Sequence, residues 1–198
     1  WQAERLGTGH AVQAAHAALG DLAADPQAEV LVTCGDTPLL TAETLADLRR
    51  TRAAQDAEIA VLGFRAADPG AYGRLVLDDD GLMAAARGIV EKPSPNTAPS
   101  FLGVVGRYIL APEVLTALAD QKPDARGEIQ LTDAIARTLS QVPLTGVRFS
   151  GERFDAGTPA GLLAAAIAEA ADDPDIASAV SDVAERIAPR APDTYSYT

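Results

Sequence analysis

The sequence predicts an α/β protein built as a three-layer sandwich, with helices on both sides of a sheet. Two observations predict this class. Short apolar runs rich in β-branched residues, such as residues 29–34, alternate with longer segments whose apolar residues recur at helical spacing, such as residues 9–22. Turn-forming residues, notably Gly35 and Pro38, stand between the two kinds of segment. This alternation makes the sandwich the expected architecture.

Each expected element follows from its local pattern. Strands are expected where short apolar runs occur, at residues 29–34, 58–64, 73–77, 88–90, 102–110 and 144–149. Helices are expected from apolar spacing and start signals, at residues 9–22, 112–119, 129–140, 159–171 and 176–187, with one more beginning at Thr41. Turns are expected at 68–70 and 78–81, and a proline-rich loop at 93–99. Residues 188–198 are expected to be frayed or disordered.

Length and charge limit the classes of function. With 198 residues, 47% of them hydrophobic, the chain can form one globular domain plus a small appendage. A formal net charge of −12 argues against non-specific nucleic-acid binding, which needs a basic surface. No apolar stretch is long enough for a bilayer and no signal-peptide pattern opens the chain, so no membrane partner is expected. The single cysteine, Cys34, favours a cytoplasmic location.

Asp36 is the first candidate for a functional residue. The strand expected at 29–34 reads as central and buried on both faces, and Gly35 and Pro38 end it. Asp36 would then lie at the carboxyl edge of the sheet, where ligands bind in open α/β folds. A carboxylate there suits Mg²⁺ that carries a nucleotide phosphate. An aspartate that only caps the turn explains the residue equally well.

Three short motifs occur in order along the chain: Leu6-Gly7-Thr8-Gly9-His10-Ala11, Gly35-Asp36-Thr37-Pro38-Leu39 and Gly88-Ile89-Val90-Glu91-Lys92-Pro93. With them the chain resembles the sugar-1-phosphate nucleotidyltransferases over roughly residues 1–170. From Gln2 to about Met83 it is similar to the N-acetylglucosamine-1-phosphate uridyltransferase branch. From about Gly88 onward it is similar to the UTP–glucose-1-phosphate uridylyltransferase branch, with further likeness in 104–108, 127–135 and 153–157.

The resemblance implies a fold and a reaction. The fold would be nucleotide-diphospho-sugar transferase-like, with a mixed, mostly parallel sheet that lacks its first βα unit. A nucleotidyltransferase-like domain would span 1–171 and a helical or partly disordered tail 172–198. A sugar-1-phosphate oxygen would attack the α-phosphorus of UTP in line, with Mg²⁺ as cofactor, and pyrophosphate would leave. The partners would be UTP and a sugar-1-phosphate, with UDP-glucose favoured over UDP-N-acetylglucosamine as product, and a homo-oligomer is possible.

The resemblance also assigns residues. Asp36 and Asp155 match the metal-binding aspartates, although Asp155 also reads as an acid placed before a helix N-terminus. Glu91 and Lys92 match the residues for sugar hydroxyls and sugar phosphate. Adjacent residues on a regular strand point to opposite faces, so the pair needs a bend, which Pro93 supplies. A surface loop is the alternative for this pair.

The remaining candidates lie near the start of the chain and before one strand. Gln2, Gly7 and Thr8 match the family's uracil-binding side, while a Gly-Thr-Gly turn before a helix is also an ordinary capping turn. Gly73 matches a glycine whose backbone contacts the sugar, or it simply begins a hairpin.

The chain departs from the family pattern in ways that affect function. The 198 residues contain no Gly-x-Gly-Thr-Arg phosphate loop and no hexapeptide repeat for acetyl transfer, and Phe101 stands where an asparagine precedes the glucose-branch strand. Without that loop, donors for the leaving pyrophosphate are missing. We expect impaired activity, and the sequence reads as a fragment or a fusion with a seam near 84–87. The alternative function is a non-catalytic nucleotide-sugar binding module.

Overall fold

The computed structural model describes residues 2, 4–20, 25, 28–65, 72–77, 86–171 and 173–187. The chain divides into two compact units. Unit 1 comprises Trp1–Gly35 and Leu40–Glu152, and unit 2 comprises Asp36–Leu39 and Arg153–Thr198. The expected boundary between a domain at 1–171 and a tail at 172–198 stays a prediction.

Within the described residues, unit 1 contains the sheet and four helices. In chain order they are α1 (Thr8–Leu19), β1 (Val30–Thr33), α2 (Ala42–Ala54), β2 (Ile59–Arg65), β3 (Arg74–Leu77), β4 (Ala86–Val90), β5 (Leu102–Leu110), α3 (Pro112–Ala119), α4 (Leu131–Thr138) and β6 (Leu144–Arg148). Unit 2 contributes α5 (Pro159–Ala170) and α6 (Pro174–Ile187). Every expected strand and helix is confirmed in type, with ends that differ by a few residues.

Polar caps and proline explain where two helices begin. The Thr41 side chain accepts a hydrogen bond from the Thr44 backbone N–H, at 3.2 Å, directly before α2. Thr158 accepts in the same way from Gly161, at 3.1 Å, and Pro159 occupies the first turn of α5. Both threonines satisfy amide groups that have no partner inside the helix, and proline loses nothing at this position.

The sheet has six strands in the order β4-β3-β5-β2-β6, and β1 pairs with β5. Only the β2–β6 pairing is parallel among the described residues; β1–β5, β2–β5, β3–β4 and β3–β5 are antiparallel. The α/β class and the mixed sheet are confirmed, but the expectation of a mostly parallel sheet is wrong. Alternation of strands with helices does not specify strand direction, and β5 runs against three neighbours.

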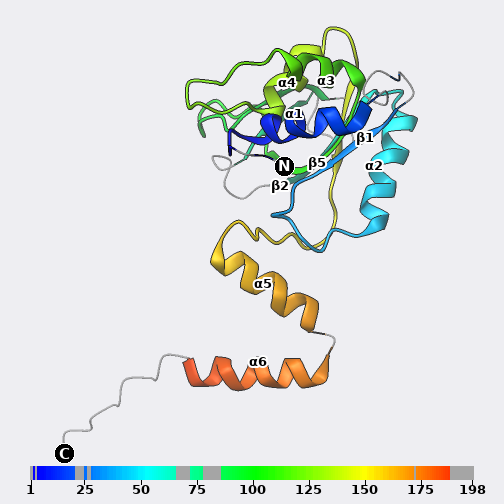
Figure 1. Ribbon diagram of the computed structural model, residues 1–198. Helices are drawn as coiled ribbons and strands as arrows, with labels where there is room; N and C mark the ends of the chain where they lie inside the picture. Colours follow the sequence, from blue (N-terminus) through cyan, green and yellow to red (C-terminus); the bar gives the residue numbers. More distant parts are fainter. Residues whose placement is uncertain are drawn as a thin grey trace, which may run out of the picture. The chain divides into compact units, whose positions relative to one another are not determined.

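Two apolar clusters cover opposite faces of this sheet. On one face, α1, α3 and α4 lie together (Figure 1), and their side chains, including Val12, Leu115 and Ile135, pack with Ile59 and Val61 of β2. On the other face, α2 places the fully buried Leu48 against alternate residues of the same strands, such as Ala60, Leu62 and Val105. The three-layer arrangement of unit 1 therefore follows from strands with apolar residues on both faces.

β1 differs from expectation. It was expected to be central and buried on both faces, but within the described residues it pairs with β5 alone and its exposure alternates. Val30 and Val32 pack toward the cluster with α1, whereas Leu31 on the opposite face is 47% exposed. The expectation was wrong because an uninterrupted apolar run shows which residues could be buried, not which neighbours cover them.

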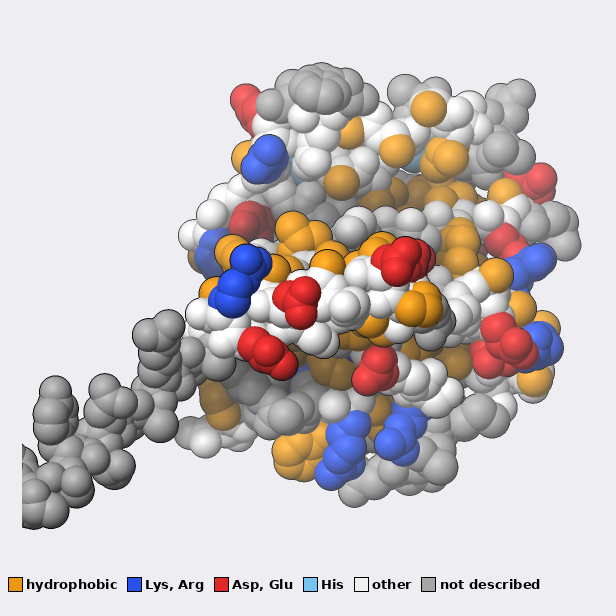
Figure 2. Space-filling view, turned by 90° about the horizontal axis from the view of Figure 1, so that it is seen from below, with side chains coloured by type: hydrophobic (Ala, Val, Ile, Leu, Met, Phe, Trp, Pro, Cys, Tyr) orange, Lys and Arg blue, Asp and Glu red, His pale blue; other side chains and the backbone are white. Residues whose placement is uncertain are grey.

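Some expectations lie outside the described residues: the turns at 68–70 and 78–81, the first half of the seam at 84–87, and the tail at 188–198. Among the helices that are described, none has the length and apolar content needed to cross a membrane. Apolar side chains are exposed on both helices of unit 2, including Leu163 of α5 and Ile187 of α6. The face drawn in Figure 2 shows such orange side chains between acidic and basic ones.

Truncation of Leu48 tests the core of unit 1. Leu48→Ala removes a side chain with no exposed surface, so it should lower the free energy of unfolding by about 2–5 kcal/mol. Leu31→Ala is the matched control, because the same atoms are lost from a half-exposed position, and it should cost about 1 kcal/mol. Urea denaturation followed by circular dichroism measures both. Equal losses for the two variants would show that β1 is buried on both faces after all.

Candidate functional site

The two predicted metal ligands lie close together in unit 2. The backbone N–H of Ala156 donates to the backbone carbonyl of Asp36, at 2.8 Å, and so joins the two short segments. Gly157 lies between the aspartates: a Cβ on this glycine would be 3.1 Å from Asp155 Oδ1 and 4.0 Å from the Asp36 Cβ. Residues separated by more than one hundred positions therefore meet around a glycine.

Both carboxylates already have protein partners. Thr37 donates its hydroxyl to Asp36 Oδ1, at 3.4 Å. At Asp155, Oδ2 accepts from the Arg153 guanidinium, at 3.2 Å, and Oδ1 accepts from the Gly157 backbone N–H, also at 3.2 Å. Each carboxylate oxygen has two lone pairs, so a carboxylate that accepts such bonds is still able to accept from a further ligand. The cap of α5 is Thr158, so Asp155 is not needed for that role.

The fit of Mg²⁺ to this pair can be judged from the donor set. Among the described residues, no group of three or more His, Cys, Asp or Glu side chains could hold a metal by itself. Mg²⁺ in nucleotide enzymes typically takes one or two carboxylates together with water and substrate phosphates. Two aspartates that approach the same glycine match that requirement in number and in type of ligand. The residues therefore fit a Mg²⁺–nucleotide complex better than a metal held by protein alone.

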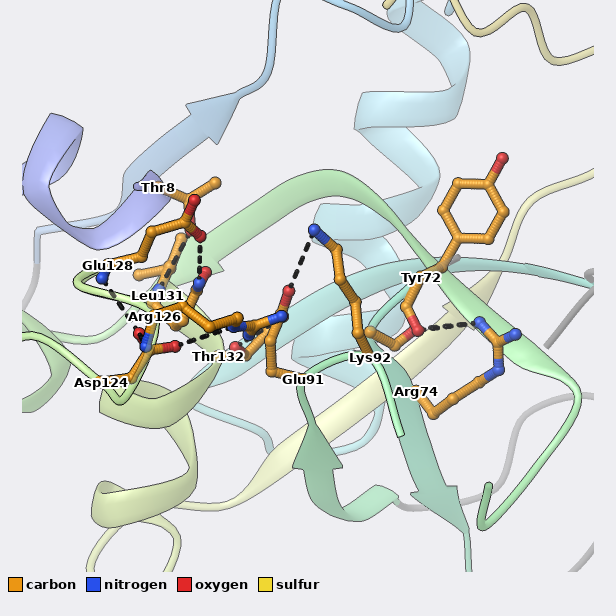
Figure 3. Close-up of polar contacts among 12 residues, drawn as sticks. Thr8, Tyr72, Arg74, Glu91, Lys92, Asp124, Arg126, Glu128, Leu131 and Thr132 are labelled. Carbon is orange, nitrogen blue, oxygen red and sulfur yellow. Dashed lines mark hydrogen bonds and ion pairs between the residues drawn. The ribbon is translucent and has the colours of Figure 1, made fainter. Parts of the chain in front are cut away.

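Glu91, Lys92 and Gly73 come together in unit 1, at the ends of β3 and β4 (Figure 3). The Lys92 ammonium lies 3.8 Å from Glu91 Oε1. A Cβ on Gly73 would lie 3.4 Å from Glu91 Oε2. The Glu91 side chain is 15% exposed and the Lys92 side chain 48%, so a mostly buried carboxylate adjoins an accessible cation. This cluster offers one acceptor group and one point charge to a ligand.

The backbone at Lys92 explains how neighbouring residues share one site. β4 ends at Val90, and Lys92 has a φ of +35°, a backbone conformation that residues other than glycine seldom adopt. Pro93, which follows, is buried. This bend lets the Glu91 and Lys92 side chains meet, which a regular strand would prevent. Such backbone strain, typically about 1–3 kcal/mol, is concentrated at functional sites in proteins.

The predicted base-binding residues have structural partners of their own. Gln2 contacts His10 Nδ1 through its side-chain amide, at 3.0 Å. Gly7, with a φ of +99°, directly precedes α1, and a Cβ there would lie 2.8 Å from the carbonyl oxygen of Ile129. The same oxygen accepts from the Gly9 N–H at 2.8 Å. Close approach of the Ile129 backbone thus explains both glycines without a base.

Thr8 connects this turn to the start of α4. Its hydroxyl oxygen accepts a hydrogen bond from the Leu131 backbone N–H, at 3.1 Å (Figure 3). Gln130, the N-cap residue of α4, makes no side-chain cap bond. Thr8 therefore takes the place of the cap, because it supplies the acceptor for a backbone N–H in the first turn of α4. The neighbouring Thr132, which is 4% exposed, donates its hydroxyl to Glu91 Oε2 at 2.9 Å.

Sequence reasoning missed the role of Thr132. Residues 127–135 supported the family resemblance, but nothing in their order indicated that this hydroxyl reaches a carboxylate 41 positions away. The only available signal was that Thr132 is polar, whereas its neighbours in the expected helix, Leu131, Ala134 and Ile135, are apolar. A buried hydroxyl on the apolar side of a helix needs a partner, and Glu91 is that partner.

Two carboxyl groups near α4 have shifted pKa values. The Glu128 backbone N–H donates to Asp124 Oδ1, at 3.0 Å, and this bond lowers the pKa of the Asp124 carboxyl below its ordinary value. Burial raises the pKa of Asp133, in the first turn of α4, and the nearby charge of Asp124 adds to the effect. Ionised Asp124 therefore anchors the loop that leads into α4.

Arg107 and Gly106 fix the end of β1 in unit 1. Arg107 is buried and donates to the Cys34 carbonyl oxygen, at 2.7 Å, and the Cys34 N–H donates to Gly106, at 2.9 Å. Gly106 has a φ of +79°, and a Cβ there would lie 2.9 Å from the Cys34 side chain. The chain is therefore firmly held one residue before the Gly35-Asp36 turn.

Comparisons with known proteins agree with the predicted resemblance. A model of the nucleotidyl transferase family matches residues 1–172. A UTP–glucose-1-phosphate uridylyltransferase of Staphylococcus haemolyticus is 36% identical over 87% of this chain and 59% of its own length. The bifunctional protein GlmU of a Bradyrhizobium species is 44% identical over 71% of this chain and 30% of its own length. Both branches that the motifs indicated are thus represented.

Solved structures confirm the fold. A UDP-glucose pyrophosphorylase from Acinetobacter baumannii superposes with a TM-score of 0.74 at 26% identity, covering 93% of this chain and 64% of that one. A UTP-bound structure of this enzyme gives a TM-score of 0.72 at 27% identity, covering 93% of this chain and 63% of that one.

The chain spans about a third to three fifths of the length of the curated relatives that it matches. The match of the family model nevertheless extends through both units, across the segments that carry Asp36, Glu91, Lys92 and Asp155. The chain therefore belongs to the nucleotidyl transferase family.

Proposed function

We propose that the chain carries the catalytic residues of a UTP-dependent sugar-1-phosphate uridylyltransferase, which forms a UDP-sugar and pyrophosphate. The observation that carries this proposal is the cluster of Glu91, Lys92 and Gly73, with Lys92 held at a positive φ. The chain has only two lysines, and one of them occupies this strained position beside a mostly buried carboxylate. Relatives that are named as uridylyltransferases support the same reaction.

The residues divide the work of the reaction. An oxygen of the sugar-1-phosphate forms a bond to the α-phosphorus of UTP, and the bond between that phosphorus and the pyrophosphate oxygen breaks. Lys92 neutralises and positions the attacking phosphate as a point charge, and Glu91 accepts hydrogen bonds from sugar hydroxyls. Asp36 and Asp155 would hold Mg²⁺, which when bound neutralises phosphate charge. Gln2, Gly7 and Thr8 are proposed for the uracil side.

We further propose glucose-1-phosphate as the sugar substrate. The relatives that cover most of this chain are named as UTP–glucose-1-phosphate uridylyltransferases, at 34–36% identity over 83–88% of its length. UDP-glucose should therefore bind more tightly than UDP-N-acetylglucosamine. We also propose a cytoplasmic location, a homo-oligomer, and reduced turnover by these 198 residues when they are tested by themselves.

Lys92 can be tested against the other lysine of the chain. Lys92→Ala should weaken UDP-glucose binding about 10–100-fold, because a charged partner of the ligand phosphate is lost. Lys122→Ala, at an exposed position in a loop, removes the same charge and is the control; it should bind as the wild type does. Isothermal titration calorimetry with UDP-glucose measures both. Equal weakening in both variants would contradict a local role for Lys92 and indicate a general charge effect.

The metal pair is tested by the dependence of binding on Mg²⁺. Mg²⁺ should enhance UTP binding by the wild type, and Asp36→Asn and Asp155→Asn should each reduce that enhancement. The reduction should be at least roughly 10–100-fold, which is the loss of metal affinity that removal of an outer-shell partner already causes. Asp47→Asn, an exposed carboxylate of α2, is the control and should leave the enhancement intact. UTP titrations with Mg²⁺ and with EDTA give the two affinities. An unchanged enhancement in both site variants would exclude these aspartates as ligands.

A further inference from the structure

We infer that Thr132 is a positioning residue: it holds the Glu91 carboxylate in the orientation that accepts sugar hydroxyls. This inference rests on the proposed function, because it gives Glu91 the role of sugar acceptor. The contact itself is independent of that role. Thr132 donates to Glu91 Oε2 at 2.9 Å, while Lys92 lies 3.8 Å from the other oxygen, Oε1 (Figure 3).

The two contacts on Glu91 differ in strength. A separation of 3.8 Å is an ion pair without a hydrogen bond, whereas 2.9 Å is an ordinary hydrogen-bond length. The Thr132 hydroxyl is therefore the contact that fixes where the carboxylate points. Without it, Glu91 would be free to turn toward the Lys92 ammonium and form a closer pair. That pair would occupy the acceptor meant for the sugar and the cation meant for the phosphate.

Thr132 is well suited to hold a partner still. It is 4% exposed, lies in the first turn of α4, and carries a β-branched side chain with few accessible rotamers. Its methyl carbon would lie 3.5 Å from a Cβ on Gly73, so the side chain is packed on the sugar side as well. A carboxylate that accepts one bond from this hydroxyl keeps lone pairs for ligand hydroxyls.

The start of α4 is itself held by the predicted base-binding turn. Leu131, the neighbour of Thr132, donates its N–H to the Thr8 hydroxyl at 3.1 Å. Thr8, Leu131, Thr132 and Glu91 thus form a continuous chain of contacts from the nucleotide side to the sugar side. Movement of the turn that contains Thr8 would be passed to the Glu91 carboxylate through two consecutive residues at the start of α4.

Three variants separate positioning from a general loss of stability. Thr132→Val keeps the shape of the side chain and removes the hydroxyl, and it should weaken UDP-glucose binding about tenfold, the usual effect of losing one hydrogen bond to a charged group. UDP, which lacks the glucose moiety, should lose less affinity than UDP-glucose does. Thr132→Ser restores a hydroxyl and should restore binding. Thr138→Val is the control, because within the described part of the chain that buried hydroxyl of α4 donates to the Ile135 carbonyl of its own helix and not to Glu91.

Calorimetric titration of all variants with UDP and with UDP-glucose gives the result, with thermal melting to confirm folding. Equal loss of UDP and UDP-glucose affinity, or equal effects of Thr132→Val and Thr138→Val, would overturn the positioning role. A double-mutant cycle with Glu91→Ala, which removes the acceptor of the Thr132 hydroxyl, adds a second measure: Thr132→Val should cost nothing further in that background, and additive losses would contradict action through Glu91. A wild-type chain that gains no affinity from the glucose moiety would overturn the proposed function and this role with it.

Discussion

The backbone of Ile129 is the contact on which the unit 1 site depends. Its N–H donates to the Leu6 carbonyl at 2.7 Å, and its carbonyl accepts from the Gly9 N–H at 2.8 Å. These two bonds join the turn before α1 to the segment before α4, over a separation of more than one hundred residues. Side chains at 7 or 9 would collide with the Ile129 carbonyl oxygen, so glycine is required at both positions. Thr8, placed between those glycines, can then cap α4, and α4 brings Thr132 to Glu91.

The elements of the fold could be predicted because their signals are local, whereas the site depends on distant pairings. Thr41, Thr158 and Pro159 mark helix starts within a few residues of the helices that they begin, and the structure agrees. The apolar pattern of β5 does not encode its direction relative to its neighbours, so the expectation of a mostly parallel sheet was wrong. Burial of Leu31 likewise depends on what covers β1, which an apolar run does not specify.

The roles of the candidate site residues stay predictions, but some of their contacts follow from the sequence. The motif resemblance pointed to Glu91 and Lys92, and Pro93 gave a reason for the bend that lets them meet. The resemblance also pointed to Asp36 and Asp155, which the structure brings to the same glycine. Thr132 was missed because its function depends on a bond to a strand end 41 residues away. Gly7, which the resemblance matches to the uracil-binding side, is needed first for the close approach of the protein's own backbone, as is Gly9.

The net charge of −12 bears on how such a site can bind a nucleotide. Long-range attraction would favour cations rather than phosphates, so under the proposed function the affinity for UTP or a UDP-sugar would have to come from short-range contacts. A lysine at a strained backbone position, held near a carboxylate but not in a close hydrogen bond with it, keeps a positive charge available to a phosphate. A closer Glu91–Lys92 pair would neutralise that charge. Under the proposed function, the Thr132 hydroxyl, by holding Glu91 from the other side, would therefore support phosphate binding in addition to its main effect on the sugar.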